Sequence, residues 1–214
     1  MKLTNLIVIL VLSIFYSCKK DKDPKAPDPV IETTNTMDLL QYKTGNYWVY
    51  QVTYTPEDTA NSSVITDNDS IIVAGDTVIM GNTYKVIIRT EGNDVFSYFY
   101  RDSSGFLIDN IGQIFFSSKV HNVAFNHYSN VYKNDTIHGH FDIIDGSLKS
   151  ISMPAGDFKA YNRMRFNFYN GPTERIERKT ITAFAPGTGI VYYEKFYIGS
   201  KHGSVIGRLL RYKV

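Results

Sequence analysis

Residues 47–55 read YWVYQVTYT, and this stretch decides the predicted fold. Its larger side chains recur at every second position: Trp48, Tyr50, Val52 and Tyr54. A period of two places these side chains on one face of an extended chain, which is typical of a strand buried on one side. Aromatic and β-branched residues also favour strands. We therefore expect an opening strand here, with Trp48 anchoring one end of the core.

Similar segments fill the rest of the chain, separated by turn residues roughly every 8–12 residues, as in antiparallel sandwiches and barrels. Further strands are expected at 70–73, 77–80, 83–90, 95–101, 106–109, 114–118, 137–144, 148–153, 158–169, 175–184, 190–197 and 204–214. No segment shows a sustained helical period, although a short helix fits residues 37–42. The pattern predicts an all-β fold of about 10–12 strands, arranged as a half-open barrel or a sandwich.

Three connections carry specific expectations. Ala74, Gly75 and Asp76 are predicted to form a turn between two short strands. The segment 119–130 is predicted to be irregular. Asp145 and Gly146 form a type I′ hairpin signal, so strands 137–144 and 148–153 are expected to pair with each other.

The N-terminus is typical of an export signal. Lys2 precedes an uncharged run, residues 3–17, that is shorter than the roughly 20 residues needed to cross a bilayer. The run ends at Cys18, the single cysteine, and this junction resembles a bacterial lipobox. That resemblance implies a lipoprotein signal peptide at 1–17 and acyl chains such as palmitate on Cys18. The alternative is an ordinary signal peptide followed by an incidental cysteine.

Residues 18–36 contain three prolines and alternating charges, with too few apolar side chains to pack. We interpret them as the lipidated N-terminus and a flexible tether, followed by a single β domain at 37–214. The charged run 19–23 resembles the surface-export signals of Bacteroidota lipoproteins, and a plain soluble linker is the alternative. The expected location is the outer membrane, facing either the periplasm or the cell surface, with the membrane contacted through the anchor on Cys18.

The amino-acid composition argues against some classes of function. The formal net charge is +2, and loss of Lys2 with the signal peptide leaves +1. A net charge this close to zero does not favour electrostatic binding to nucleic acid. Once Cys18 is lipidated, no thiol remains for a disulfide or a nucleophile. Aromatic residues make up 14% of the chain, so a packed β core can hold the domain together.

Four short motifs together resemble a group of uncharacterised Bacteroidota lipoproteins. They are Gly45-Asn46-Tyr47-Trp48-Val49-Tyr50, Met153-Pro154-Ala155-Gly156-Asp157-Phe158, Ala185-Pro186-Gly187-Thr188-Gly189-Ile190-Val191 and Leu209-Leu210-Arg211-Tyr212. The resemblance covers most of 38–214. It implies a strongly curved antiparallel sheet, in the form of a half-open barrel, and it brings no catalytic residues with it.

The predicted function is a non-enzymatic, membrane-anchored envelope lipoprotein that binds an apolar ligand such as a lipid. The candidate ligand-binding residues are Trp48, Tyr50, Tyr98 and Tyr100. The alternative is an adaptor or adhesion module that binds an envelope protein or a glycan. A hydrolase is the least favoured class, because the chain has no serine-nucleophile elbow and its carboxylates form no recognisable catalytic pair. No cofactor is expected.

Two polar patterns are candidate metal or modification sites. His138, His140 and Asp142 share one face of a strand, but three side chains without an evident fourth ligand make only a weak metal candidate, and no metal site is predicted. A repeated Asp-Ser/Thr-apolar pattern resembles the O-glycosylation sequon of exported Bacteroidota proteins. It marks Thr59, Ser70, Thr77 and Thr136, for which turn-to-strand chemistry is the alternative explanation.

Overall fold

A computed structural model of the chain describes residues 35–56, 65–132, 135–170, 175–196 and 202–214. All of them belong to one compact unit, Ile31–Val214. The expected signal peptide, the lipidation site Cys18 and residues 18–34 of the expected tether lie outside the described residues, as does Thr59. Within the described segments, no helix has the length and apolar character to cross a membrane.

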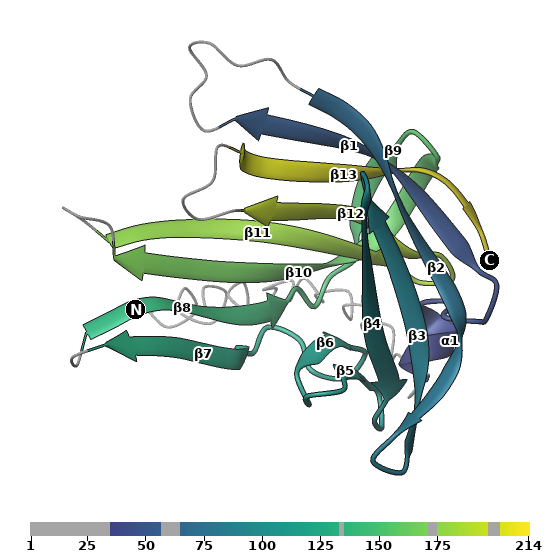
Figure 1. Cartoon of the computed structure of the whole chain (residues 1–214), viewed down its shortest axis with the longest axis horizontal. Helices are drawn as coiled ribbons and strands as arrows, with labels where there is room; N and C mark the ends of the chain where they lie inside the picture. The colour runs from purple at the N-terminus through teal and green to yellow at the C-terminus, as the bar shows by residue number, and fades with distance from the viewer. Residues whose placement is uncertain (1–34, 57–64, 133–134, 171–174, 197–201) are drawn as a thin grey trace, which may run out of the picture. The chain divides into compact units, whose positions relative to one another are not determined.

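The unit is built almost entirely of strands (Figure 1). One short helix, α1 (Thr36–Leu39), precedes them. The strands are β1 (Tyr47–Pro56), β2 (Ile65–Ile79), β3 (Asn82–Glu91), β4 (Asp94–Asp102), β5 (Phe106–Asp109), β6 (Ile114–Ser117), β7 (Phe125–Tyr132), β8 (Asp135–Ile144), β9 (Lys149–Met153), β10 (Gly156–Asn170), β11 (Arg175–Ala185), β12 (Gly189–Phe196) and β13 (His202–Lys213).

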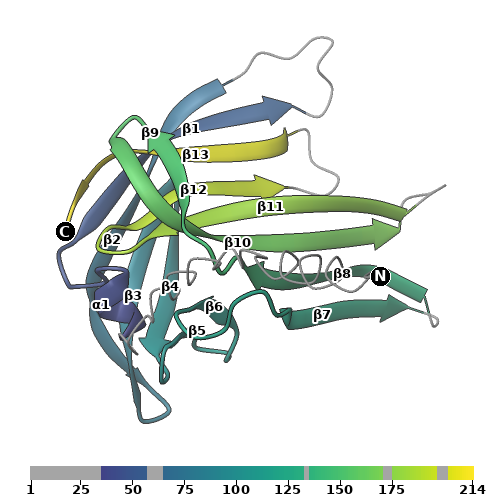
Figure 2. The ribbon, with the colours of Figure 1, turned by 180° about the vertical axis from the view of Figure 1, so that it is seen from behind.

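In the part of the chain that the structure describes, twelve strands pair in the order β6-β5-β4-β3-β2-β1-β13-β12-β11-β10-β8-β7, and β9 pairs with β10 beside this path. Among the described residues the paired strands are antiparallel, for example β1 with β13 and β10 with β11. Figure 2 shows how the sheet curves so that its two ends, β6 and β7, approach each other. The prediction of an all-β, strongly curved antiparallel sheet is confirmed, and of the two expected forms, a half-open barrel or a sandwich, the sheet takes the first.

Three connections differ from the expectation. The predicted turn at 74–76 is wrong: β2 runs through it as one strand with a bulge between Val73 and Gly75, and its pairing with β3 continues beyond that bulge. Residues 125–130 are not irregular, because β7 pairs with β8. Strands β8 and β9 do not form a hairpin, since β8 lies between β7 and β10 while β9 pairs with the start of β10.

The opening strand supplies the centre of the core, as the side chains of Trp48 and Tyr50 are fully buried. The Trp48 Nε1–H group donates a hydrogen bond to the Thr188 carbonyl at 2.5 Å, and the Tyr50 hydroxyl donates to the Ile190 carbonyl at 2.9 Å. Gly189 lies between these acceptors with φ +103°. A Cβ atom there would lie 2.9 Å from the Leu40 carbonyl oxygen, so the turn before β12 requires glycine.

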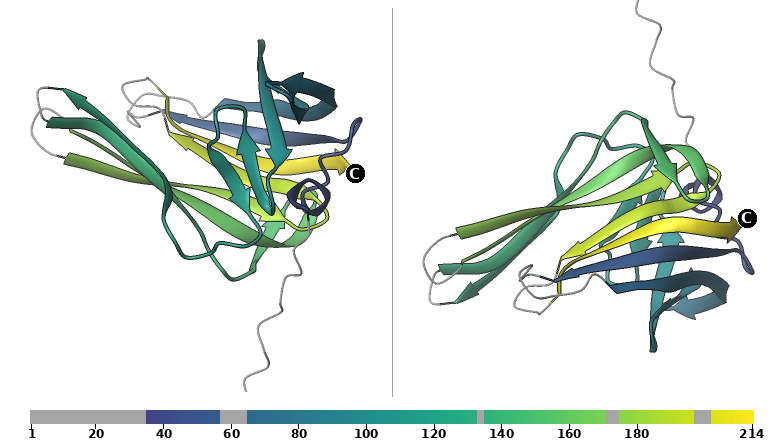
Figure 3. Two further views of the ribbon diagram at one scale, coloured as in Figure 1. Left: turned by 90° about the horizontal axis from the view of Figure 1, so that it is seen from below. Right: turned by 90° about the horizontal axis from the view of Figure 1, so that it is seen from above.

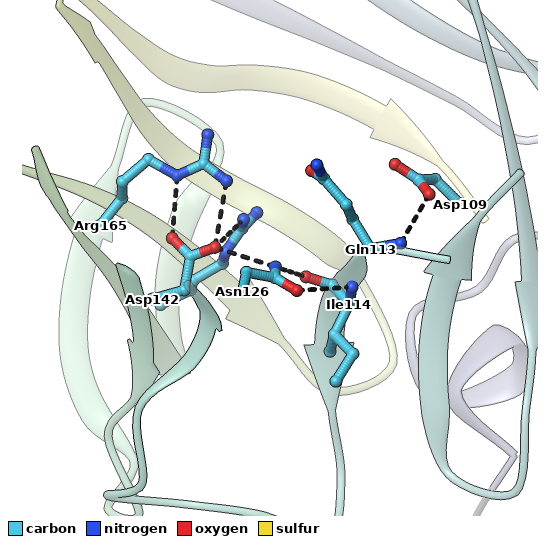
Figure 4. A network of polar contacts seen from close by, with 7 residues as sticks. Asp109, Gln113, Ile114, Asn126, Asp142 and Arg165 are labelled. Atoms are coloured by element: carbon cyan, nitrogen blue, oxygen red, sulfur yellow. Dashed lines mark hydrogen bonds and ion pairs between the residues drawn. The ribbon is translucent and has the colours of Figure 1, made fainter. Parts of the chain in front are cut away.

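The open seam between β6 and β7 is bridged by one side chain (Figure 4). The Ile114 N–H group donates to the amide oxygen of Asn126 at 3.0 Å, and the Asn126 amide nitrogen donates to the Ile114 carbonyl. An amide side chain carries one acceptor and a donor group, so it satisfies the backbone of β6 as a paired strand would. Asn126 has φ +52°, and the β7–β8 register shifts between Phe125 and Tyr128.

Asp142 on β8 holds Asn126 and two arginines of β10 (Figure 4). Its carboxylate, which is fully buried, accepts hydrogen bonds from Arg163 Nη2 at 2.6 Å and from Arg165 Nε and Nη2 at 2.8 and 3.0 Å. The Asn126 amide donates to the same carboxylate at 3.0 Å. Burial alone would raise the pKa of Asp142, but the two guanidinium groups outweigh burial and lower this pKa to about 2.

We predict that Asp142→Asn lowers the free energy of unfolding by about 3–5 kcal/mol at neutral pH, because it leaves the nearly buried Arg163 and the half-buried Arg165 without their counter-charge. The folded pKa of about 2 lies below the ordinary carboxyl value. The stabilisation is therefore present above pH ~4 and is lost as the pH falls through about 2. Urea unfolding at neutral and acidic pH measures this, and a difference between the two proteins that stays constant down to pH ~2 would contradict it.

We predict that Gly189→Ala destabilises the domain by about 1–3 kcal/mol through backbone strain combined with the Leu40 contact. Gly187→Ala is the matched control, because Gly187 also has positive φ (+75°) but nothing lies near its would-be Cβ. Thermal unfolding of both variants separates the two causes, with the larger loss expected for Gly189→Ala. Equal losses would mean that only the φ angle matters.

Candidate ligand-binding cavity

The curved sheet encloses a cavity of about 300 Å³ between its opposing walls. One wall comes from β2, β3 and β4, and the other from β10, β11 and β12. The lining residues are Tyr42, Ile71, Ile87, Arg89, Tyr98, Tyr100, Phe115, Arg165, Thr182, Ile190, Tyr193, Glu194 and Lys195. This volume lies at the small end of the roughly 300–1,000 Å³ that is usual for ligand sites.

One side of the cavity is aromatic. Tyr98 and Tyr100 lie at alternate positions of β4 and stack with their ring centroids 6.3 Å apart. Tyr100 also stacks on Phe115 of β6 at 4.7 Å, and Tyr42 lies 6.4 Å from Tyr100. Burial raises the pKa of Tyr42 and of Tyr100, so both phenols remain neutral at physiological pH. The faces of these rings offer apolar surface, and Tyr42, Tyr98 and Tyr100 each add a hydroxyl group to it.

The other side carries a charged network. The Tyr193 hydroxyl donates to Asp69 Oδ2 at 2.6 Å, and the Arg89 guanidinium lies 4.2 Å from the Tyr193 ring centroid. Arg89 pairs with Asp69 at 3.2 Å and with Glu91 at 2.6 Å, while Lys195 pairs with Glu91 from across the cavity. Burial and the Arg89 charge lower the pKa of Lys195, against the opposing effect of Glu91. The network joins β2, β3 and β12.

A second chamber of about 250 Å³ shares Arg165, Thr182, Glu194 and Lys195 with the first. It lies where β11 and β12 part: their pairing ends at Thr182 and Tyr193, although both strands continue. Beyond that point the Ile181 N–H group donates to the Glu194 carboxylate at 3.0 Å. Figure 3 shows β11, with β10 and β8, diverging from β12, β13 and β1 toward one end of the sheet.

The candidate ligand-binding residues separate into two groups. Tyr98 and Tyr100 line the cavity, whereas Trp48 and Tyr50 are absent from its lining. Trp48 and Tyr50 are core residues whose polar atoms bond backbone carbonyls beside the turn into β12. Tyr50 still contributes indirectly, because its ring packs edge-on against Tyr193 at 5.2 Å.

The weak metal candidates lie together on β8, but Asp142 is engaged by two arginines. Among the described residues, no cluster of three or more His, Cys, Asp and Glu side chains could hold a metal ion. The rings of His138 and His140 lie 6.2 Å apart. Burial and the Arg165 charge lower the pKa of His140 to about 4, so this imidazole is neutral at physiological pH.

The glycosylation candidates lie within strands where the structure describes them. Ser70 and Thr77 are half-buried residues of β2, opposite Val49 of β1 and Tyr84 of β3 respectively. Thr136 lies in β8, and its side chain is outside the described part of the structure. O-glycosylation at these positions stays a prediction.

The charged residues of the lining were not predicted from the sequence: Arg89, Arg163, Arg165, Glu194 and Lys195. Asp69 of β2, which pairs with Arg89, is buried. A signal was present in β10, where Arg163, Arg165 and Asn167 alternate with Met164, Phe166 and Phe168. This alternation shows that the two faces of β10 differ in polarity. The usual expectation that the apolar face is turned inward is wrong here, because the arginines face the interior.

No family model matches the chain, and no curated protein matches it either. Two solved structures are similar to it. One is described as a candidate lipoprotein from Parabacteroides distasonis, with 14% identity, a TM-score of 0.48, and coverage of 80% of this chain and 96% of that one. The other is described as a candidate exported protein with a YmcC-like fold from Bacteroides fragilis, with 15% identity, a TM-score of 0.45, and coverage of 80% and 97%.

Proposed function

We propose that this protein is a membrane-anchored envelope lipoprotein whose β domain is a non-enzymatic binding module for an apolar ligand such as a lipid. The observation that carries the proposal is the cavity between the two walls of the curved sheet. Its aromatic and aliphatic lining provides the apolar surface that small-molecule sites generally have. The anchor is supported by the lipobox-like junction at Cys18 and by the tether-like composition of the residues that follow it.

The cavity suits binding better than catalysis. The acidic lining residue, Glu194, accepts hydrogen bonds from the Tyr192 hydroxyl at 2.5 Å and from the Ile181 N–H group at 3.0 Å. Asp69 and Glu91 are held by Arg89. A general base needs a carboxylate that can accept a proton from substrate. Both oxygens of Glu194 are engaged within the protein, and Asp69 and Glu91 do not line the cavity.

The direct test is native mass spectrometry of residues 18–214 carrying Cys18→Ser, exported with a non-lipoprotein signal so that no covalent lipid is present. We expect a bound species that organic extraction removes and that re-associates from an envelope lipid extract. A protein that carries no adduct and takes up none from the extract would refute the proposal.

We predict that Thr182→Phe abolishes this adduct, because Thr182 lines both chambers at their junction and a phenyl ring would fill it. Thr66→Phe is the matched control, since Thr66 is exposed on β2. Retained binding in Thr182→Phe, with both variants folded by circular dichroism, would place the ligand outside this cavity.

A second candidate function is an adaptor that binds an envelope protein or glycan through the face of β8 and β10 opposite Asp142 and Arg165. On this face Phe141 and Phe166 stack with their centroids 5.0 Å apart, and a groove of about 240 Å³ adjoins them. Its lining also includes Arg178 and Lys179. Aromatic rings beside charged groups are common at recognition surfaces. Cross-linking on cells, followed by loss of the product in Phe166→Ser, would support this role.

A further inference from the structure

We infer that the ligand is a single-chain anionic amphiphile, with its carboxylate or phosphate held by Arg165 and Lys195 and its chain against the aromatic wall of β4. This inference rests on the proposed binding function and specifies its ligand. Arg165, Lys195, Thr182 and Glu194 line both chambers, so the two cations stand where the charged chamber meets the aromatic one. A molecule that fills both chambers must place a polar group at this junction.

The surface offered to a ligand is cationic. The charged residues lining the two chambers are Arg89, Arg163, Arg165, Lys195 and Glu194, four cations and one carboxylate. The carboxylates that balance the remaining charge, Asp69, Glu91 and Asp142, do not line either chamber. An anion that enters these chambers therefore meets more positive than negative lining groups. The negative charge of Glu194 repels an anion and keeps the anionic group away from this carboxylate.

Arg165 has hydrogen-bonding capacity left for a ligand. Two guanidinium groups share the one carboxylate of Asp142. The Nε and Nη2 atoms of Arg165 are used by Asp142, and its remaining nitrogen points away from that carboxylate (Figure 4). The Arg165 side chain is 33% exposed, against 9% for Arg163. Arg163 Nε is buried without a hydrogen-bond partner, a further sign that acceptors are scarce here. An anionic group would supply the missing acceptor.

The volumes favour one chain over two. The aromatic chamber measures about 300 Å³ and the charged chamber about 250 Å³, and they overlap at four residues. Ligand sites usually span roughly 300–1,000 Å³, so this site holds a small amphiphile such as a fatty acid or an alkyl phosphate and not a diacyl lipid.

The test is isothermal titration of the Cys18→Ser mature chain with four probes of one chain length: dodecanoate, dodecyl phosphate, dodecanol and dodecylamine, all kept below micelle formation. We expect the two anions to bind at least about tenfold more tightly than dodecanol, and dodecylamine to bind most weakly. Whichever anion binds more tightly identifies the headgroup class, carboxylate or phosphate. Equal affinities for dodecanoate, dodecyl phosphate and dodecanol would overturn the inference but leave the binding function standing. If none of the four probes binds, the result would contradict both this inference and the proposed binding function.

Two adjacent residues of β12 give variants with opposite expectations. Lys195→Gln should weaken dodecanoate binding about tenfold and leave dodecanol unchanged, whereas Glu194→Gln should strengthen dodecanoate binding. Lys159→Gln, which removes an exposed cation bonded to Ser150, is the control for net charge. If Lys195→Gln fails to fold, Glu194→Gln still tests the inference. An unchanged or weakened affinity for dodecanoate in Glu194→Gln would contradict the proposed position of the anionic group.

Discussion

The arrangement of the sheet depends on one buried carboxylate that satisfies two arginines. Asp142 is fully buried, and an ion so far from water is tolerated only when its hydrogen-bonding capacity is filled. Arg163, Arg165 and Asn126 fill it, and Asn126 then extends across the seam to Ile114. One carboxylate thus links β8 to β10 and, through Asn126, to β7 and the opposite edge strand β6. The sheet closes at this point by side chains where it has no backbone pairing.

The same interaction determines the chemistry of the interior. Because Asp142 draws Arg163 and Arg165 to the inner face of β10, the aromatic residues that alternate with them lie on the opposite face. The interior therefore combines a packed aromatic region around Tyr50, Tyr193 and Phe184 with a charged region near the split of β11 and β12. An interior that is apolar at one side and cationic at the other suits an amphiphile better than a purely apolar molecule.

The sequence allowed the fold class to be predicted, because Trp48, Tyr50 and Val52 alternate and the turn residues recur at short intervals. The prediction was wrong where pairing between strands that are distant in sequence overrides local turn signals. Gly75 marks a bulge and not a turn, Asn126 lies in a strand with no apolar pattern, and the turn at Asp145 joins strands that pair with other partners. The aromatic half of the candidate site was predicted through Tyr98 and Tyr100. The charged half was not, because Arg89, Arg165 and Lys195 come from three strands whose proximity depends on how the sheet curves.

The most direct test of this account is a crystal structure of residues 18–214 with Cys18→Ser, grown with the tightest-binding anionic probe. The account predicts continuous density for one chain along Tyr98, Tyr100 and Phe115, with the anionic group within hydrogen-bonding distance of Arg165 and Lys195. Density on the outer face near Phe141 and Phe166, with the interior left empty, would contradict it and favour the adaptor role.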